Sequence, residues 1–379
     1  MNPIYLDYNA TTPIDPRVRE AMLPYLGEHF GNPSTTYGYG LRAREAVEQA
    51  RRQVAALIGA KLEEIIFTSG GSESDNHAII GAALAGMDRG RHIITSRIEH
   101  PAVLNTCRYL EERLGFKVTY IPVDGCGLVD PDDVRHAIVR ETILITIMHA
   151  NNEVGTIEPI EEIGRIAVER GVLFHTDAAQ SCGKIDVSVN RMNVDLLTIA
   201  GHKLYAPKGI GVLFVRGGTR IDPFIHGAGQ EGGRRAGTEN VPYIVGLGAA
   251  CEIALNTLSD YKKEAERLRD RLHTRIEAGL GKERLRLNGH PEKRLPNTLN
   301  ISISGIVGED LLRNIPEIAA STGAACHAGS TEPSSVLLEM GLSRDWALGA
   351  LRLTLGRWTT QEEIDTAGKL IAERARIVN

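Results

Sequence analysis

The chain has few cysteines, few aromatic residues and no block of charge of one sign. Its five cysteines are widely spaced and form no Cys-x-x-Cys pair, which argues against a disulfide framework and against an all-cysteine zinc site. Acidic and basic residues are mixed and the net charge is −5, so we expect no nucleic-acid partner. We find no apolar run long enough to cross a bilayer and no secretory signal pattern at the N-terminus. These absences predict a cytoplasmic protein without membrane contact.

Glycine, by contrast, is abundant, with 40 residues in a chain of 379. Several glycines occur in pairs, at 70–71, 217–218 and 232–233. Paired glycines are typical of tight turns and of places where the backbone approaches a ligand closely. The length is sufficient for one large domain and one smaller domain, each with a core of its own.

Short apolar segments alternate with helix-compatible segments over about residues 15–256. Because the apolar segments are unbroken, they predict a buried, mostly parallel sheet flanked by helices, an α/β fold. The predicted strands are 65–67, 92–95, 143–148, 172–176, 196–200 and 211–215, and the predicted helices are 41–58, 73–86, 160–170 and one that starts near Pro101.

The remaining residues, 1–14 and 257–379, predict a smaller α+β domain. It would contain a charged helix at 259–280, strands at 297–304 and 351–355, and a Gly/Ala-rich loop around Cys326. Thr360 and Glu363 have the spacing of a capping box for a last helix.

Polar side chains follow nearly every predicted strand of the large domain. In open α/β sheets, ligands bind beyond the carboxyl ends of the strands, so we expect these side chains to form one site. They are Ser69, Ser72, Glu99, His100, Asn151, Asn152, Asp177, Gln180, His202 and Lys203.

Each of these groups has a functional and a structural interpretation. The turn at 69–72 suits a phosphate at a helix N-terminus, or it is a simple turn with a serine cap. Asp177 suits a protonated pyridine nitrogen, or it forms a structural ion pair or cap. Lys203 suits an imine with an aldehyde cofactor, or it is a solvated surface lysine. His100 suits stacking on an aromatic cofactor and proton exchange, or its ring nitrogens have their hydrogen-bond partners within its strand-to-helix junction.

Cys326 differs from the other cysteines because its neighbours are small and offer no large packing surface. This setting suits an accessible nucleophilic thiol. His327 is next to it, although side chains of adjacent residues seldom face each other.

Ten segments in order resemble the cysteine desulfurases, the NifS/IscS-like members of the class-V aminotransferase group of pyridoxal-phosphate enzymes. They are LDYNATTP, FGNPST, IIFTSGGSESDN, IEHPAV, MHANNEVGTI, HTDAAQSCGK, GHKLYAPKGIG, RRAGTENVP, STGAACHAGS and ALRLTLGR. The resemblance covers almost the whole chain and implies fold type I and a homodimer with the cofactor, pyridoxal 5'-phosphate, near the subunit interface.

The resemblance also implies a role for each site residue. Lys203 would hold the cofactor as an imine, and Cys326 would be the nucleophile. Asp177 would pair with the ring nitrogen, Gln180 with the ring hydroxyl, and His100 would stack on the ring. The other implied roles are Gly71, Ser72, His202 and Thr238 of the partner subunit for the phosphate, Asn152 facing cofactor and substrate, and Arg352 for the substrate carboxylate.

The implied reaction converts L-cysteine to L-alanine and leaves a persulfide on Cys326. Lys203 would take the Cα proton, and an acceptor protein, an iron–sulfur scaffold or a thiolation enzyme, would receive the sulfur. Two departures stand out: Ala200 replaces a serine that often contacts the phosphate, and the GAACH segment also resembles selenocysteine lyases. Selenocysteine lyase, an aminotransferase-like relative and a non-catalytic sulfur-trafficking or nucleotide-binding scaffold are therefore the alternatives.

Overall fold

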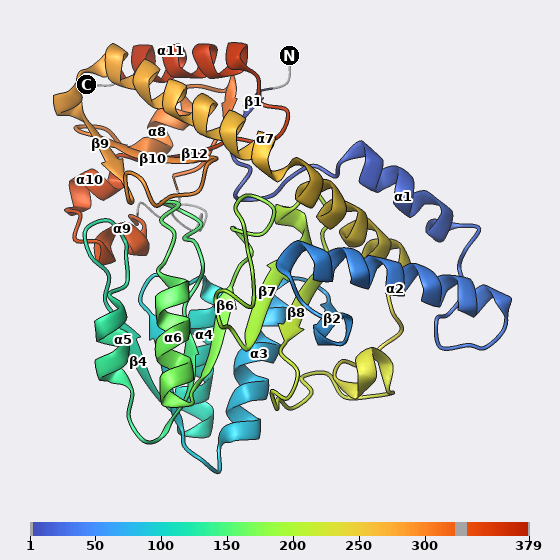
Figure 1. Cartoon of the computed structure of the whole chain (residues 1–379). Coiled ribbons are helices and arrows are strands. Elements are labelled where there is room, and N and C mark those ends of the chain that lie inside the picture. The colour runs from blue at the N-terminus through green and yellow to red at the C-terminus, as the bar shows by residue number, and fades with distance from the viewer. Residues whose placement is uncertain (1–2, 323–331, 378–379) are drawn as a thin grey trace.

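The computed structural model describes residues 3–322 and 332–377. Figure 1 shows a larger unit built on a central sheet and a smaller unit above it, with one long helix running through both. The predicted nucleophile Cys326 and its neighbour His327 lie outside the described residues.

The larger unit contains a seven-stranded sheet in the order β2-β8-β7-β6-β5-β3-β4. Only the pairs that involve β8 are antiparallel, so the prediction of a mostly parallel sheet is confirmed. The segment between β7 and β8, residues 201–210, contains no helix long enough for a parallel crossover, which explains why β8 reverses direction. The strands are β2 Ile65–Thr68, β3 His92–Ser96, β4 Lys117–Ile121, β5 Thr142–Thr146, β6 Leu173–Asp177, β7 Leu196–Ala200 and β8 Gly211–Val215.

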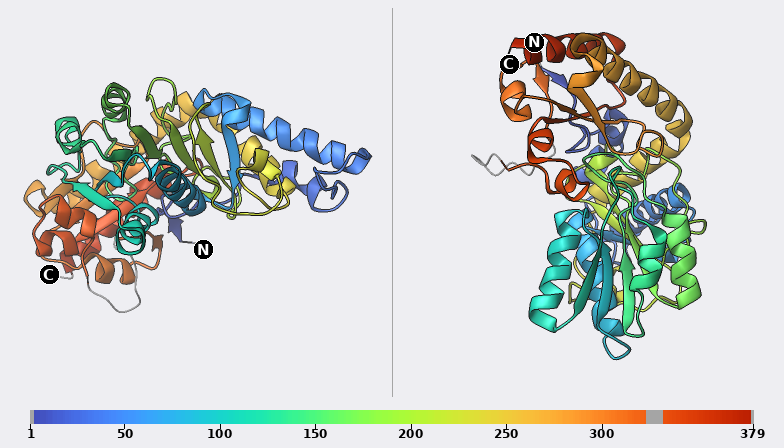
Figure 2. Two further views of the ribbon diagram at one scale, coloured as in Figure 1. Left: turned by 90° about the horizontal axis from the view of Figure 1, so that it is seen from below. Right: turned by 90° about the vertical axis from the view of Figure 1, so that its left-hand side faces the viewer.

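Helices cover both faces of this sheet, as the right-hand view of Figure 2 shows. Alternate strand residues point to opposite faces: Leu197 packs in one core and its neighbour Leu196 in the other. The helices of the first core are α2 Gly38–Ile58, α6 Ile160–Arg170 and the first part of α7 Val241–Leu280, and those of the second are α3 Gly71–Gly86 and α4 Pro101–Leu114. Two further helices, α1 Pro16–Leu26 and α5 Pro131–Ala137, also contribute buried residues to the first core.

The smaller unit is an antiparallel three-stranded sheet, in the order β12-β10-β9, packed against helices. The last part of α7 and α11 Gln361–Ile377 share its core. Thr360 and Glu363 form the predicted capping box, because each backbone N–H donates to the other side chain. The remaining elements are β1 Ile4–Tyr5, β9 Leu285–Asn288, β10 Thr298–Ile303, β11 Ile318–Ala319, β12 Ala350–Thr354, α8 Gly308–Arg313, α9 Ser335–Glu339 and α10 Arg344–Leu348.

The long helix α7 crosses the domain boundary that the sequence predicts near 256. Its buried residues up to Ala254 belong to the core of the larger unit, and those from Leu268 onward belong to the core of the smaller unit. By length and composition alone, α7 is also the one helix in the described ranges that could cross a bilayer, contrary to our prediction that no such segment exists. In the most apolar part of α7, 44% of the residues are buried inside the protein, and core helices pass the same test.

Candidate active site

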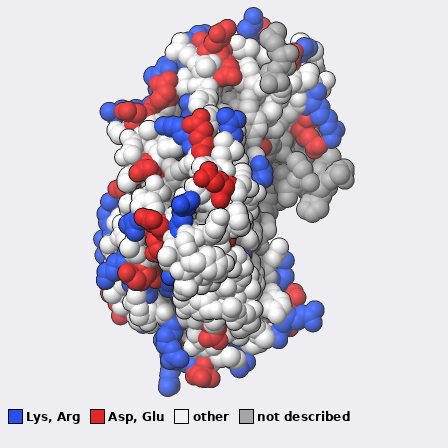
Figure 3. Space-filling view, turned by 90° about the vertical axis from the view of Figure 1, so that its right-hand side faces the viewer, with Lys and Arg blue, Asp and Glu red and all other residues white. Residues whose placement is uncertain are grey.

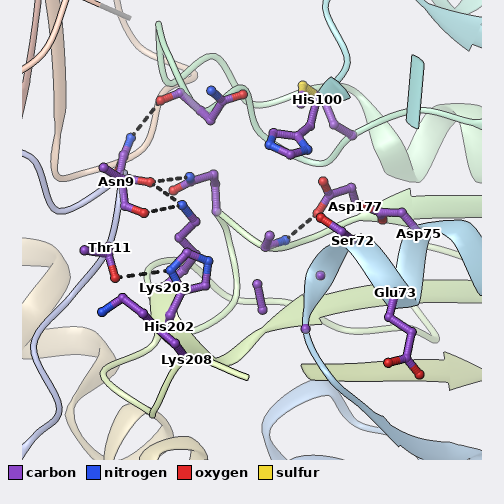
Figure 4. A pocket seen from close by; sticks show the side chains of 18 of the residues that line it. Asn9, Thr11, Ser72, Glu73, Asp75, His100, Asp177, His202, Lys203 and Lys208 are labelled. Atoms are coloured by element: carbon purple, nitrogen blue, oxygen red, sulfur yellow. Dashed lines mark hydrogen bonds between the residues drawn. The ribbon is translucent and has the colours of Figure 1, made fainter. Parts of the chain in front are cut away.

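A cavity of about 630 Å³ lies between the carboxyl ends of the parallel strands and the smaller unit. Figure 4 shows side chains from the larger unit and from the N-terminal segment pointing into it, and Arg352 of the smaller unit also lines it. The sequence did not identify Asn9, Thr11 and Asp75, which also line it. The predicted residues in its wall are Ser69, Gly71, Ser72, His100, Asn152, Asp177, Gln180, His202, Lys203 and Arg352.

Lys203 ends a short 3-10 turn, Gly201–Lys203, directly after β7. Its Nζ donates to the backbone oxygens of Asn9 and Ala10, each at 2.7 Å. Burial and the nearby Arg352 lower the pKa of Lys203 to about 8, although Asp177 and Asp7 act in the opposite direction. A lowered pKa leaves part of the amine neutral near physiological pH, and the neutral amine is the form that attacks an aldehyde.

Asp177 ends β6 and is 7% exposed. Its Oδ1 accepts the backbone N–H of Ala179 at 2.8 Å, so the capping interpretation holds in part. Burial raises the pKa of this carboxyl, and the Ala179 N–H, His100 and Lys203 lower it by less. Within the described part of the chain, no lysine, arginine or histidine nitrogen lies within 4 Å of Asp177 as an ion-pair partner. A cationic group in the cavity would therefore find an uncompensated carboxyl there.

Asp75 forms a second buried carboxyl on the same side of the cavity. Burial and the charge of Asp177 raise the pKa of Asp75 well above its usual value. Its Oδ1 is 3.7 Å from His175 Nε2 and has no hydrogen-bond partner in the described structure. Burial lowers the pKa of His175 to about 3, so this histidine is neutral and does not compensate the acids. Two neighbouring buried carboxyls strongly favour a positive charge between or beside them.

The start of α3 lies at the far edge of the cavity. Gly70 has φ 149°, in the region that favours glycine, and a Cβ at Gly71 would lie 3.1 Å from the Cβ of Ala200. The first backbone N–H groups of a helix have no partner within the helix and bind anions well. Glu73, in the first turn, points away from the cavity and pairs with Arg235 at 2.8 Å, which removes its charge from this site (Figure 4).

Two histidines face the cavity from opposite sides. His100 caps α4, since its Nδ1 accepts the N–H of Ala102 at 3.1 Å, and this contact leaves Nε2 for the cavity. Burial and Lys203 lower the pKa of His100, while Asp177 raises it. His202 contacts Thr11 Oγ1 at 3.2 Å, and burial followed by Lys203 lowers its pKa to about 4. His100 therefore caps its junction and lines the cavity as well.

Arg352 reaches the cavity from β12 of the smaller unit. Its Nη2 donates to Asp7 Oδ1 at 2.8 Å, and its Nη1 to the backbone oxygen of Asn152 at 3.4 Å. The guanidinium is almost buried, yet its Nε has no hydrogen-bond partner among the described residues. This Nε is itself buried, so a carboxylate in the cavity would meet the planar guanidinium through its Nη groups.

Two residues that the sequence placed at strand ends lie elsewhere, and Thr238, which the resemblance assigns to the site of the partner subunit, does not line the cavity of its own chain. Glu99 and Asn151 are buried behind the cavity wall, where Glu99 accepts the Met148 N–H and Asn151 accepts the N–H groups of Glu153 and Val154. Thr238 lines a separate cavity of about 190 Å³. A polar residue at a strand end can satisfy backbone groups of its own loop instead of facing the ligand side.

Comparisons with known proteins give one consistent result. The sequence pattern of the class-V aminotransferases matches residues 4–366. The chain is 51% identical over 372 residues to "Cysteine desulfurase IscS" of Methanosarcina thermophila, covering 98% of this chain and 91% of that protein. It is 49% identical over 375 residues to "Cysteine desulfurase" of Trichormus azollae, covering 98% and 93%.

Two solved structures extend this result to the fold. A "NifS-like protein" is 40% identical with a TM-score of 0.92, covering 98% of each chain. "SspA in complex with cysteine" is also 40% identical, with a TM-score of 0.82, covering 94% of this chain and 99% of the other.

Proposed function

The chain belongs to the class-V aminotransferase family and is a cysteine desulfurase that depends on pyridoxal phosphate, and we propose that Cys326 carries the resulting persulfide. Its relatives favour this activity over selenocysteine lyase. The observation that carries the proposal is that Lys203, Asp177 and Arg352 line one cavity while coming from distant parts of the chain.

The residues of the cavity fit the chemical groups of pyridoxal phosphate. Its aldehyde suits the Lys203 amine, its protonated ring nitrogen suits the uncompensated Asp177 and Asp75, and its phosphate suits the start of α3 beside His202. Ala200 offers a methyl group here and no hydrogen-bond donor. When bound, the cofactor withdraws electrons from the Cα of an amino acid attached to it.

The chain's own residues then supply binding and proton transfer. Arg352 holds the substrate carboxylate, with Asn152 beside it, and Gln180 holds the ring hydroxyl. Lys203 Nζ takes the Cα proton, and His100, which would lie against the ring, would move protons through Nε2. The Cys326 thiolate attacks the substrate sulfur. The sulfur–sulfur bond forms as the Cβ–S bond breaks, and Cβ keeps the electron pair and is protonated. Lys203 Nζ returns a proton to Cα, which gives L-alanine.

We also propose that the active protein is a homodimer in which Thr238 of the partner subunit completes the phosphate site. Exposed aromatic residues support an interface near the start of α2: Phe30 is 71%, Tyr37 61% and Tyr39 58% exposed. Figure 3 faces the side on which α1 ends and α2 begins, and a broad area there carries neither acidic nor basic side chains. Thr238 lies outside the cavity of its own chain, as this arrangement requires.

The persulfide would pass to an acceptor protein, an iron–sulfur scaffold or a thiolation enzyme, in the cytoplasm. A free nucleophilic thiol requires a reducing compartment, which supports this location. The described cysteines form no disulfide.

The test is a product assay on the purified full chain. We expect a yellow protein that converts L-cysteine to alanine and transfers sulfur to an added thiol. Cys326→Ala should keep the colour and the cofactor but lose sulfur transfer. Normal transfer by that variant would exclude Cys326 as the nucleophile, and a keto acid in place of alanine would indicate transamination.

A further inference from the structure

Lys184 is a second buried lysine beside the cavity, and the proposed mechanism does not use it. Lys184 is only 3% exposed. Its Nζ donates to Gln180 Oε1 at 2.8 Å and to Asn9 Oδ1 at 3.0 Å. In the described ranges, no carboxylate lies within 4 Å of this nitrogen. Burial lowers the pKa of Lys184 well below its usual value, with further contributions from Lys203 and Arg352.

Burying a lysine without a counter-ion costs free energy, so the stability of the fold alone does not explain why Lys184 occupies this position. An apolar side chain of the same length would fill this space without desolvating an amine. The contacts of Lys184 are therefore informative, because both partners belong to the cavity wall.

The first consequence of Lys184 concerns the side-chain amide of Gln180. Gln180 Nε2 donates to the backbone oxygen of Asn9 at 3.0 Å, while Oε1 accepts from Lys184. If the amide were rotated by half a turn, its NH₂ would face the Lys184 N–H groups and its oxygen would face the Asn9 oxygen. The Asn9 contact would then be repulsive, and so would the contact with a protonated Lys184, so these two partners together fix which end of the amide points where. The second N–H of Gln180 remains for the cavity.

The second consequence of Lys184 concerns Asn9. The Asn9 side-chain oxygen accepts from Lys184 Nζ and from Asn297 Nδ2 at 3.1 Å, and its nitrogen donates to Thr298 Oγ1 at 2.9 Å and to the backbone oxygen of Asn152 at 3.2 Å. These four contacts use the full hydrogen-bonding capacity of the side chain. The backbone oxygen of the same residue accepts Lys203 Nζ. Lys184 thus contributes to holding the backbone against which Lys203 rests.

We propose that Lys184 is a positioning residue for cofactor binding, acting through the orientation of Gln180 and through Asn9. This inference rests on the proposed function, because it assigns the free Gln180 N–H to an acceptor on the cofactor ring. Lys184 itself has no contact with that ring; it acts on the ring's partner.

The test is a double-mutant cycle on the dissociation constant of pyridoxal phosphate, followed by the visible absorption of the full chain. We expect Lys184→Met and Gln180→Leu each to weaken binding by about tenfold, the size of one lost hydrogen bond to a charged or oriented partner. The double variant should bind only a few fold more weakly than Gln180→Leu, because Lys184 then has no amide to orient and acts through Asn9 alone. A double variant weakened by about 100-fold, or an unchanged Lys184→Met, would overturn the proposal.

Two further variants separate positioning from folding. Lys184→Gln keeps an N–H donor without a charge, and we expect its binding to lie closer to wild type than that of Lys184→Met, even if the methionine variant folds poorly. If Lys184→Gln folds normally and binds as weakly as Gln180→Leu, orientation by an N–H donor is excluded. Thr298→Val is the matched control, since it removes a contact of Asn9 without touching Gln180. Its effect on cofactor binding should add to that of Gln180→Leu in the double variant. A non-additive result would mean that the two residues are coupled through Asn9 alone, and this would contradict the role given to the amide.

A cofactor-free measurement supplies an independent readout. The labelling rate of the Lys203 amine by an amine reagent, followed by mass spectrometry across pH, reports the environment of Nζ. Lys203 faces Asp177, Asp7, Arg352, His100, His202 and Lys184. We expect Lys184→Met to shift the labelling midpoint of Lys203, and no shift would contradict the link through Asn9. If the wild-type chain bound no cofactor at all, the proposed function would fail. If the wild-type chain bound the cofactor and the Lys184 variants bound it equally well, only the role of Lys184 would be excluded.

Discussion

The acidic and the basic sides of the cavity are built in different ways. Asp75 and Asp177 come from α3 and β6, which pack directly against each other within the larger unit. Lys203, Lys184 and Arg352 instead meet around the N-terminal segment at Asp7 to Ala10, and Arg352 comes from the smaller unit. The acids are therefore fixed by the packing of α3 on the sheet, whereas the bases depend on contacts between separate parts of the chain.

Burial drives both sides toward their neutral forms. It raises the pKa values of Asp75 and Asp177 and lowers those of Lys184 and Lys203. The two sides therefore need a ligand with a positive end for the acids and negative groups for the bases. A pyridinium ring with a phosphate, joined by a substrate carboxylate, has this distribution of charge. The comparison predicts that changes on the basic side affect bond formation and substrate capture, and changes on the acidic side affect the electron-withdrawing step.

The largest effect is expected from removing the Lys203 amine. Lys203→Ala should lower the rate of alanine formation by about 10⁴-fold or more, because one group supplies both the covalent attachment and the base. The visible band of the bound cofactor should shift or disappear.

Lys203→Arg is the matched control for this loss, since it keeps a positive charge between Asp177 and Arg352 but forms no imine. It should be as inactive as the alanine variant. Substantial activity in the arginine variant would mean that charge, and not the amine, is what the basic side contributes.

The next largest effect is expected on the acidic side, at Asp177. Asp177→Asn keeps the size of the side chain and an oxygen for the Ala179 N–H but removes the charge that would hold the ring nitrogen protonated. We expect kcat to fall by about 10²- to 10³-fold with a smaller change in cofactor binding. Steady-state kinetics and a cofactor titration separate the two quantities. Asp177→Glu should recover part of kcat, and a kcat loss below about tenfold in Asp177→Asn would refute the role.

Much of the cavity was predictable because its residues directly follow apolar strands. Asp177, His202 and Lys203 occupy such positions, and parallel strands bring their carboxyl ends to one edge. Asp75 was missed because it lies inside a helix, and its direction toward β6 depends on how α3 packs on the sheet. Lys184 was missed because nothing local distinguishes it from a solvated lysine. Asn9 occurs in one of the recognised segments, but its partners come from both units.

The fold shows the same division between local and long-range information. The apolar strands and the capping box at Thr360 follow from neighbouring residues. The reversal of β8 depends on the absence of a crossover helix in residues 201–210, and the passage of α7 through both cores depends on packing partners far away in the chain. Short-range patterns therefore predict elements, and the relation between the two units had to come from the structure.

A smaller effect is expected from Arg352, where the two units meet. Arg352→Lys keeps the charge near Asp7 but loses the planar pair of donors that matches a carboxylate. We expect KM for L-cysteine to rise by about 10- to 100-fold with kcat changed much less, in line with the loss of one or two charged hydrogen bonds. Cofactor binding should stay close to that of the wild type, which separates this variant from Lys203→Ala. An unchanged KM would show that the substrate carboxylate binds elsewhere.

The smallest effect on turnover is expected at Glu99, an acid that lies behind the acidic side without lining the cavity. Burial raises its pKa to about 8, although Ser96 and the Met148 N–H act against this. In the unfolded chain a glutamate releases its proton near its ordinary pKa of about 4.3. Between these two values the folded state binds more protons than the unfolded state, so this residue makes the free energy of unfolding fall as pH rises.

Glu99→Gln isolates this contribution because glutamine resembles the protonated acid. Its Oε1 can accept the same Ser96 hydroxyl and Met148 N–H, and its NH₂ takes the place of Oε2, which has no hydrogen-bond partner among the described residues. In urea unfolding from about pH 5 to about pH 8, the variant should lose stability less steeply than wild type, by up to about 1.4 kcal/mol per pH unit. Glu153, whose pKa is raised to about 7, acts with the same sign in both proteins and cancels in the difference. If the unfolding free energies of wild type and variant changed with pH in parallel, Glu99 would be ionised in the folded state. The acidic side would then carry one more negative charge than it does with a protonated Glu99.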